Sequence, residues 1–265
     1  MLRVTFLCLC AMLFVPIVNS AGEVASVDSI IITTVYDNNI YVEDVTSSWG
    51  FSCLIQGLEK TILFDTGGDG QILLANMRQL GLDPEKVEII VLSHLHGDHT
   101  GGMADFIRVN SQVTVYMPES FPQHFKREVT EGGARLVTVG DSLEICPDAF
   151  LTGQMGTAIL EQALILKTGQ GLVIITGCAH PGIVSVVETS RKIGGKVPYL
   201  VMGGFHLFGA SRSTVREILA QFRDLGVVKV SPCHCTGPEA IAMFAEAYGQ
   251  EYIQNGVGRV ITLER

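Results

Sequence analysis

The most informative segment of the chain is Ser93-His94-Leu95-His96-Gly97-Asp98-His99-Thr100-Gly101-Gly102. It follows an apolar run, residues 87–92, which predicts a buried strand. Three histidines and an aspartate therefore lie on a short turn at a strand end, where glycines allow tight turning. Imidazole and carboxylate groups this close together are typical of a site that holds two neighbouring cations. The alternative is a histidine-rich surface loop without a ligand.

Strands and helices alternate along the rest of the chain. Two hairpins are predicted from β-branched and apolar runs on either side of short turns: 51–55 with 61–65, and 163–167 with 171–176. Helical periodicity is found in four segments: 71–80, 183–193, 213–225 and 238–248. This alternation indicates a layered α/β architecture with two β-rich halves.

Six of the seven histidines directly follow a predicted strand: His94, His96, His99, His180, His206 and His234. In layered α/β folds the strand ends at one edge converge on a common cleft. We therefore expect His180 and His234 to join the first motif as metal ligands. His206 is expected to be a ligand, a residue that positions substrate, or a residue that supports a ligand. His124 is predicted to be a surface or lid histidine.

Two cysteine-containing segments lie next to these histidines. Cys178 precedes His180 by two residues and is a candidate thiolate ligand. The run Cys233-His234-Cys235 could be part of a zinc knuckle, but alternation along a strand would direct both thiols away from His234. A second cysteine pair that would complete a structural zinc site is missing from the sequence.

The first twenty residues have the pattern of a secretory signal peptide. Arg3 precedes an apolar run, residues 4–18, and small residues surround Ser20, after which we expect cleavage. The alternative is a retained anchor helix, although the run is short for a membrane span. We expect an exported protein, periplasmic or secreted, with one domain over residues 21–265. Five cysteines would remain, so at least one is unpaired.

Charge and motifs limit the function. The formal net charge of -9 becomes -10 once Arg3 is removed, which disfavours binding to nucleic-acid phosphates. We expect a small-molecule substrate and no stable membrane insertion after cleavage; the sequence does not predict an oligomeric state. No Gly-x-Ser-x-Gly elbow supports a serine hydrolase. Two cations would supply a bound hydroxide for hydrolysis of an ester, lactone, amide or phosphoester. Asp98 and His206 are the catalytic candidates.

The segment Leu63-Phe64-Asp65-Thr66-Gly67, followed by residues 93–102, resembles the metallo-β-lactamase-fold hydrolases. The resemblance implies a four-layer αββα sandwich with a metal site at one edge of two facing sheets. Three later segments are similar to one subgroup, the dihydropterin-ribofuranosylaminobenzene-phosphate synthase-like proteins: 176–182, 203–207 and 234–237. By this likeness one ion is held by His94, His96 and His180, and the other by Asp98, His99 and His234. The expected ions are zinc, with iron or manganese as alternatives.

The sequence departs from the family pattern in three places. Residues 152–156 lack the usual histidine, and Cys178 stands where a bridging carboxylate is usual. The first motif reads His94-Leu95-His96-Gly97 where the subgroup more often has His-Gly-His-Tyr. A signal peptide also conflicts with a cytosolic pterin pathway, so that substrate is not carried over. The alternatives to an exported hydrolase are a binuclear iron redox protein and a non-catalytic metal-binding protein.

Overall fold

The structure, a computed structural model, describes residues 29–265; the predicted signal peptide lies outside this range. Its first sheet has seven strands in the order β13-β1-β2-β3-β4-β5-β6. In that order the strands are Val260–Glu264, Ser29–Tyr36, Ser52–Gln56, Ile62–Phe64, Ile89–Val91, Thr114–Pro118 and Arg135–Val139. Strands β3 to β6 are mutually parallel, and β1 runs in the same direction because β2 is antiparallel to both β1 and β3.

The second sheet has six strands in the order β12-β11-β10-β9-β8-β7. In that order they are Lys229–Cys233, Pro198–Gly204, Leu172–Thr176, Leu164–Lys167, Ala149–Leu151 and Leu143–Cys146. Strands β10, β11 and β12 are parallel, whereas β7 to β10 form an antiparallel meander.

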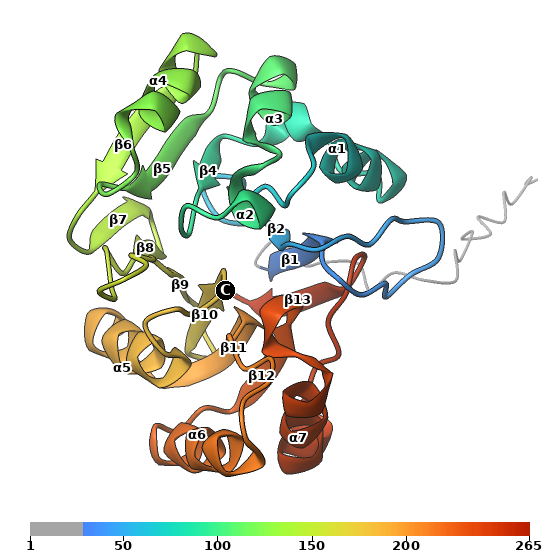
Figure 1. The fold of residues 1–265 in the computed structure, drawn as a ribbon, viewed down its shortest axis with the longest axis vertical. Coiled ribbons are helices and arrows are strands. Elements are labelled where there is room, and N and C mark those ends of the chain that lie inside the picture. The colour runs from blue at the N-terminus through green and yellow to red at the C-terminus, as the bar shows by residue number, and fades with distance from the viewer. Residues whose placement is uncertain (1–28) are drawn as a thin grey trace, which may run out of the picture.

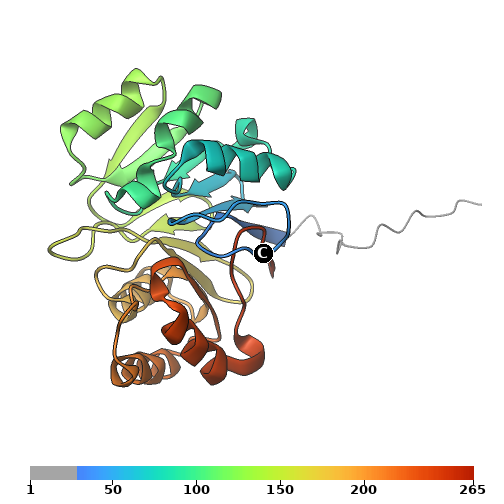
Figure 2. The ribbon, with the colours of Figure 1, turned by 45° about the vertical axis from the view of Figure 1, so that its right-hand side comes forward.

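Helices cover the outer face of each sheet (Figures 1 and 2). On the first sheet these are α1 (Gly70–Gln79), α3 (Met103–Val109) and α4 (Gln123–Glu131). On the second they are α5 (Ile183–Gly194), α6 (Arg212–Asp224) and α7 (Pro238–Tyr248). Short helical turns complete the structure: α2 (Gly97–Thr100) and the 3-10 turns η1 (Pro84–Lys86), η2 (His234–Thr236) and η3 (Gly249–Glu251). The four-layer αββα sandwich is therefore confirmed.

Side-chain alternation along the strands builds this layering. In β3, Ile62 and Phe64 enter the core between the sheets, whereas Leu63 packs under the helices of the first sheet. In β10, Val173 points into the central core and Ile174 toward helices α5 to α7. A strand that is buried on both faces has a continuous run of apolar residues, which is why these two strands could be recognised in the sequence.

Both predicted hairpins are confirmed, as β2 with β3 and as β9 with β10. The four predicted helices are confirmed as α1, α5, α6 and α7. Helix α6 begins at Arg212, one residue before the predicted start, because the Ser211 side chain caps it by accepting a hydrogen bond from Thr214 N–H. Helices α3 and α4 and strands β7 and β8 were not predicted. Helix α4 is largely polar and exposed, and its apolar side is formed by only two residues, Phe125 and Val129, which are too few for periodicity to identify a helix. Within residues 29–265 the helices are all too short or too polar to cross a membrane.

The topology brings six chain segments to one edge of the sandwich. Strands β1, β3 and β4 of the first sheet and β10, β11 and β12 of the second all end at this edge. The loops that follow these strands carry all the predicted site residues. The N-terminal end of β9 lies at the same edge because β9 is antiparallel to β10.

Candidate metal centre

The six predicted ligands form two groups at this edge. One group is His94, His96 and His180, and the other is Asp98, His99 and His234; in each group the ligand atoms lie within 4.8 Å of one another. The membership is the same as that of the two ligand sets implied by the family resemblance. The groups adjoin, because the rings of His94 and His99 are 4.3 Å apart. Metal binding by the six residues stays a prediction that this geometry supports.

Asp65, the buried residue that follows β3, orients one histidine of each group. Its Oδ2 accepts hydrogen bonds from His99 Nδ1 and from Ser93 Oγ, both at 2.7 Å. Because the Ser93 hydroxyl donates its proton to Asp65, its oxygen accepts from His94 Nδ1 at 2.9 Å. Both imidazoles are thereby held as Nδ1–H tautomers with Nε2 lone pairs directed into the site. One carboxylate therefore sets the orientation of two ligands.

The second group is held in a similar way on its other side. Asn38 Oδ1 lies 3.1 Å from His234 Nδ1, which directs His234 Nε2 to within 3.2 Å of His99 Nε2 and 3.3 Å of Asp98 Oδ2. Asp37, which is buried, accepts from the backbone N–H of His234. The two residues that follow β1 therefore position a ligand nearly 200 positions further along the chain.

A buried carboxylate positions the third segment. Glu161, only 2 % exposed, accepts hydrogen bonds from three consecutive backbone N–H groups, those of Cys178, Ala179 and His180, at 2.8–2.9 Å. This arrangement supports the left-handed backbone of Ala179 (φ 56°). It presents His180 to His94 and His96, whose rings are 4.8 and 4.9 Å away.

Left-handed backbone is concentrated here. Asp65, Ala179, His206 and His234 are four of the six non-glycine residues with positive φ in the described part of the chain. Such conformations cost about 1–3 kcal/mol each and persist where surrounding contacts enforce them. The two sheets also approach closely: a Cβ on Gly177 would lie 2.1 Å from Ser93 Oγ. Glycine is required at that position because its neighbour is the network that orients His94.

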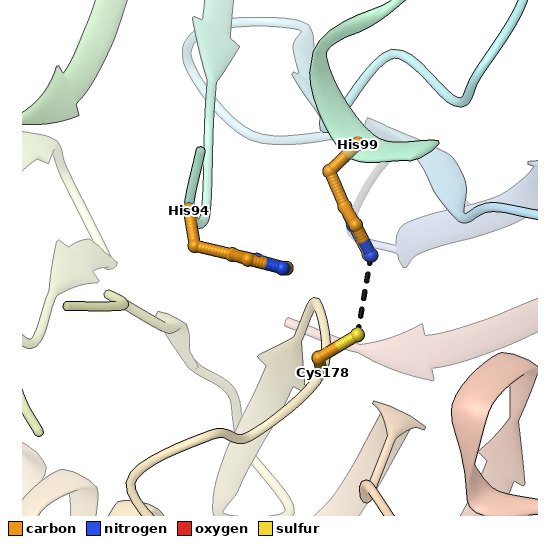
Figure 3. Close-up of side chains that lie close together, drawn as sticks. All are labelled: His94, His99 and Cys178. Atoms are coloured by element: carbon orange, nitrogen blue, oxygen red, sulfur yellow. Dashed lines mark hydrogen bonds between the residues drawn. The ribbon is translucent and has the colours of Figure 1, made fainter. Parts of the chain in front are cut away.

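Cys178 lies between the two groups. Its Sγ is 3.3 Å from His99 Nε2, and it forms a third close group with His94 and His99 (Figure 3). The thiol therefore lies where it could contact ions held by either group.

The alternation predicted for Cys233 and Cys235 is not found. Strand β12 ends at Cys233 and residues 234–236 form a 3-10 turn, so strand alternation does not apply to Cys235. Cys235 instead lies with Cys178 and His206.

The two remaining histidines belong to neither group. His206 is exposed and lies beside His180, with 4.3 Å between ring centroids, and within reach of Cys235. His124 is exposed on α4, as expected for a surface histidine, and joins none of the metal-capable groups found in residues 29–265. All five cysteines of this range are buried and unpaired.

The local electrostatics shift the histidine pKa values in opposite directions: they favour neutral imidazoles at His94 and His180 and the protonated imidazole at His99, which lies beside carboxylates. Burial and the imidazole of His99 lower the pKa of His94, and burial together with His206 lowers the pKa of His180 to about 4. Burial opposes protonation of His99 as well, but the Asp65 carboxylate outweighs it and raises the pKa of His99. Burial would raise the pKa of Asp98, yet its hydrogen bond with His234 and the nearby His99 make the net shift downward.

The residues fit divalent cations on two observations. His180 Nε2 is buried and has no hydrogen-bond partner within residues 29–265. Ring nitrogens also face each other at 3.0 Å, between His94 Nε2 and His96 Nδ1, and at 3.2 Å between His99 and His234. Buried nitrogen lone pairs directed at one another are costly unless a proton or a cation lies between them. This donor set suits zinc, iron or manganese.

Sequence reasoning missed three residues that position ligands: Asp65, Glu161 and Asn38. Asp65 was named only as part of the segment that carries the family resemblance, without a role in the site, and Glu161 and Asn38 were not singled out. An acidic residue shortly before a buried apolar strand is the only sequence feature that marks Glu161, three residues ahead of β9, and this feature is too common to be diagnostic. Their roles depend on contacts between segments distant in the chain.

The fold and this site define a class: two-sheet α/β proteins with a histidine- and carboxylate-rich metal centre at one edge. The family model described as the metallo-beta-lactamase superfamily matches residues 50–192. The chain belongs to the metallo-beta-lactamase superfamily.

Individual relatives support this assignment. The chain is 31% identical to the 7,8-dihydropterin-6-methyl-4-(beta-D-ribofuranosyl)-aminobenzene-5'-phosphate synthase of Methanocaldococcus jannaschii, over 90% of this chain and 98% of the relative. Among solved structures it is similar to Tm1679, a metal-dependent hydrolase of the beta-lactamase superfamily, with a TM-score of 0.76, 27% identity, and coverage of 89% and 100% of the two chains. The metallo-beta-lactamase fold protein YhfI from Bacillus subtilis shares the fold (TM-score 0.66, 13% identity, 88% and 99% coverage). The predicted likeness to the synthase subgroup is confirmed.

Proposed function

We propose that this protein is a metal-dependent hydrolase that cleaves an ester, lactone, amide or phosphoester bond in a small molecule. The observation that carries the proposal is the shared direction of the imidazole Nε2 atoms of His94, His99 and His234, held by Ser93, Asp65 and Asn38. Two adjoining donor sets are the arrangement that two neighbouring divalent cations require, and zinc is the first expectation. Cys178 is a candidate ligand between them.

Divalent cations bound here would lower the pKa of water to about 7 and polarise the substrate's carbonyl or phosphoryl oxygen. The side chains of the chain supply the remaining functions. Asp98 stays ionised, because its pKa is lowered, and accepts a hydrogen bond from the attacking water or binds the second ion. His206 is exposed beside His180, and its hydrogen bond with Cys235 raises its pKa, which suits a proton donor to the leaving group. Water adds to the acyl or phosphoryl centre, and the bond to the leaving group breaks.

The test is a panel of phosphodiester, lactone and aryl ester substrates, with the metal-loaded protein and with the metal removed by chelator. We expect metal-dependent turnover that Asp98→Asn lowers about 100-fold or more. Asp105→Asn is the matched control, because Asp105 pairs with Arg108 on α3 outside the site. Asp98→Asn activity equal to that of the wild type would overturn the hydrolase assignment.

A second candidate is a synthase reaction, favoured by the identity to the Methanocaldococcus jannaschii relative over most of both chains. In that case the chelator-sensitive activity would join two compounds, and the hydrolysis panel would show no turnover. Metal analysis with an absorption spectrum separates zinc from the binuclear iron of a redox protein.

We also propose that the protein is exported, on the basis of the signal-peptide pattern in residues 1–20. N-terminal sequencing of the mature protein tests this proposal.

A further inference from the structure

A cavity of about 780 Å³ lies beside the metal centre, with His234 in its wall. It is open to solvent on one side and is lined by the loop after β1, one face of α7 and the segment around Tyr252 and Gln254. Its volume falls in the range of small-molecule sites, and it borders one of the predicted ligands. The residues that line it therefore bear on which substrates the centre accepts.

Large apolar side chains are exposed in this cavity. Trp49 is 55%, Phe208 71% and Ile40 50% exposed, and all three line it. Single exposed apolar residues are ordinary, but three large ones around one concave surface beside a reactive centre indicate a binding site for an apolar group. Trp49 and Phe208 offer ring faces, which favour an aromatic ligand over an aliphatic one of the same size.

The cavity wall carries no charged side chain suited to an anion. Among residues 29–265, no lysine, arginine, aspartate or glutamate lines it, and the titratable residues in its wall are His234 and Tyr252. Nearby arginines are engaged elsewhere: Arg212 pairs with Glu239 at 3.1 Å, and the Arg259 guanidinium lies 4.7 Å from the ring centre of Tyr41. A phosphate or carboxylate placed here would lose its hydration without gaining an ionic partner.

The N-terminal end of α7 is the remaining electropositive feature of the wall. Its first residue is Pro238, which has no N–H to donate, and Glu239 places a carboxylate in the first turn. Phe208 packs against Gly237, where an added Cβ would lie 2.9 Å from Phe208 Cα. This helix end is therefore poorly suited to bind an anion, although helix N-termini often do.

Neutral polar groups complete the wall. Within residues 29–265 the side-chain amide of Gln254 and the hydroxyl of Tyr252 have no hydrogen-bond partner, whereas Asn255 bonds with Thr34 and Ser231. Gln254 and Tyr252 are free to bond with the uncharged polar substituents of a ring.

The ring of Trp49 lies 5.0 Å from that of His234, whose Nε2 points to Asp98. A group bound against Trp49 is thus separated from the metal centre by a single imidazole.

We propose that this cavity binds an uncharged aromatic or heteroaromatic group of the substrate. The inference rests on the proposed function and narrows it to neutral aryl esters, lactones and amides over substrates with a charged group at this position. The relative from Methanocaldococcus jannaschii is named for a phosphate-containing compound. The uncharged wall argues that this chain takes a different substrate.

Trp49 makes the cavity observable without turnover, because it is the single tryptophan of the sequence. The probes are 4-nitrobenzamide, neutral and quenching, and 4-nitrobenzenesulfonate, which has the same ring with a permanent negative charge. We expect 4-nitrobenzamide to quench Trp49 fluorescence saturably and to bind about tenfold or more tightly than the sulfonate. Benzamide should displace it more effectively than cyclohexanecarboxamide. The titration is run on metal-loaded and chelator-treated protein.

Two variants test the cavity itself. Phe208→Ala should weaken 4-nitrobenzamide binding about tenfold, the size of one aromatic contact, whereas Val197→Ala, at an exposed position that lines no part of this cavity, should not. Ile241→Lys should shift the preference toward the sulfonate. Equal binding of the two probes, no quenching, or an unchanged Phe208→Ala variant would each overturn the inference. Selective binding without hydrolysis of any substrate would overturn the proposed function alone.

Discussion

Oδ2 of Asp65 lies 2.7 Å from Nδ1 of His99, and both side chains are completely buried. Through Ser93 the same oxygen also fixes His94, so one carboxylate orients a histidine from each of the two groups. Metal-binding histidines depend on such partners for tautomer and ring direction. Asp65 is therefore a positioning residue for the whole centre.

Asp65→Asn should lower metal affinity about 10–100-fold, because both carboxylate oxygens accept hydrogen bonds, Oδ1 from the Ser93 N–H and Oδ2 from His99 and the Ser93 hydroxyl, and the NH2 group of asparagine would face a donor at one of these positions. Metal titration of the purified variant measures the loss. Asp69→Asn is a control of the same chemistry: Asp69 caps α1 from an exposed position, and asparagine caps as well as aspartate. Equal losses in the two variants would show that charge removal, not orientation, is responsible.

Glu161→Gln should reduce the amount of bound metal, in the same direction as His180→Ala but by a smaller amount. The glutamine oxygen can still accept from Cys178 and Ala179, but its amide would meet the N–H of His180 donor to donor. The segment that presents His180 is then displaced. Metal stoichiometry and a crystal structure of the variant check this; an unmoved His180 with full metal content would contradict it.

The cobalt-loaded protein should show sulfur-to-metal charge-transfer absorption if Cys178 is a ligand. We expect Cys178→Ser to abolish the band, because its Sγ lies among the nitrogens of His94 and His99. Cys146→Ser is the control, since Cys146 belongs to the core between the sheets. Cys235→Ser tests whether the neighbouring thiol contributes. A band that survives in the Cys178 variant would exclude this residue as a ligand.

The metal-free protein should lose stability as the pH falls from about 6.5 to about 4. Burial and the neighbouring imidazole of His206 lower the pKa of His180 to about 4, so over this range the unfolded chain binds a proton that the folded chain does not. The stability that His180 contributes is fully present above its pKa in the unfolded chain, about 6.5, and is lost as the pH falls toward its pKa in the folded chain. Urea unfolding at several pH values should show a smaller acid loss for His180→Asn than for the wild type. Identical profiles would contradict this account.

The general architecture could be predicted because it follows from local patterns. The strands β3 and β10 are buried on both faces and read as apolar runs, and the two hairpins have turn-formers between their strands. Helix α4 could not be predicted in this way, since only Val129 of its residues is buried. Strand alternation was the wrong basis for predicting the direction of the Cys235 thiol, because the strand ends at Cys233 and Cys235 lies in a 3-10 turn beside Cys178 and His206, which local sequence does not reveal.

The order of strands, turns and histidines along the chain was enough to identify the residues that follow the strand ends, and with them the six metal-capable side chains and the class of fold. The contacts that hold these side chains became visible only in the packed molecule. Asp65 meets His99, Glu161 meets residues 178–180, and Asn38 meets His234 through contacts between segments far apart in the chain. The tertiary structure also decided that Cys178 lies between the two groups and that Trp49 and Phe208 share one uncharged cavity. The physical reason is that burial and direction, which set pKa and donor geometry, arise only when the two sheets pack.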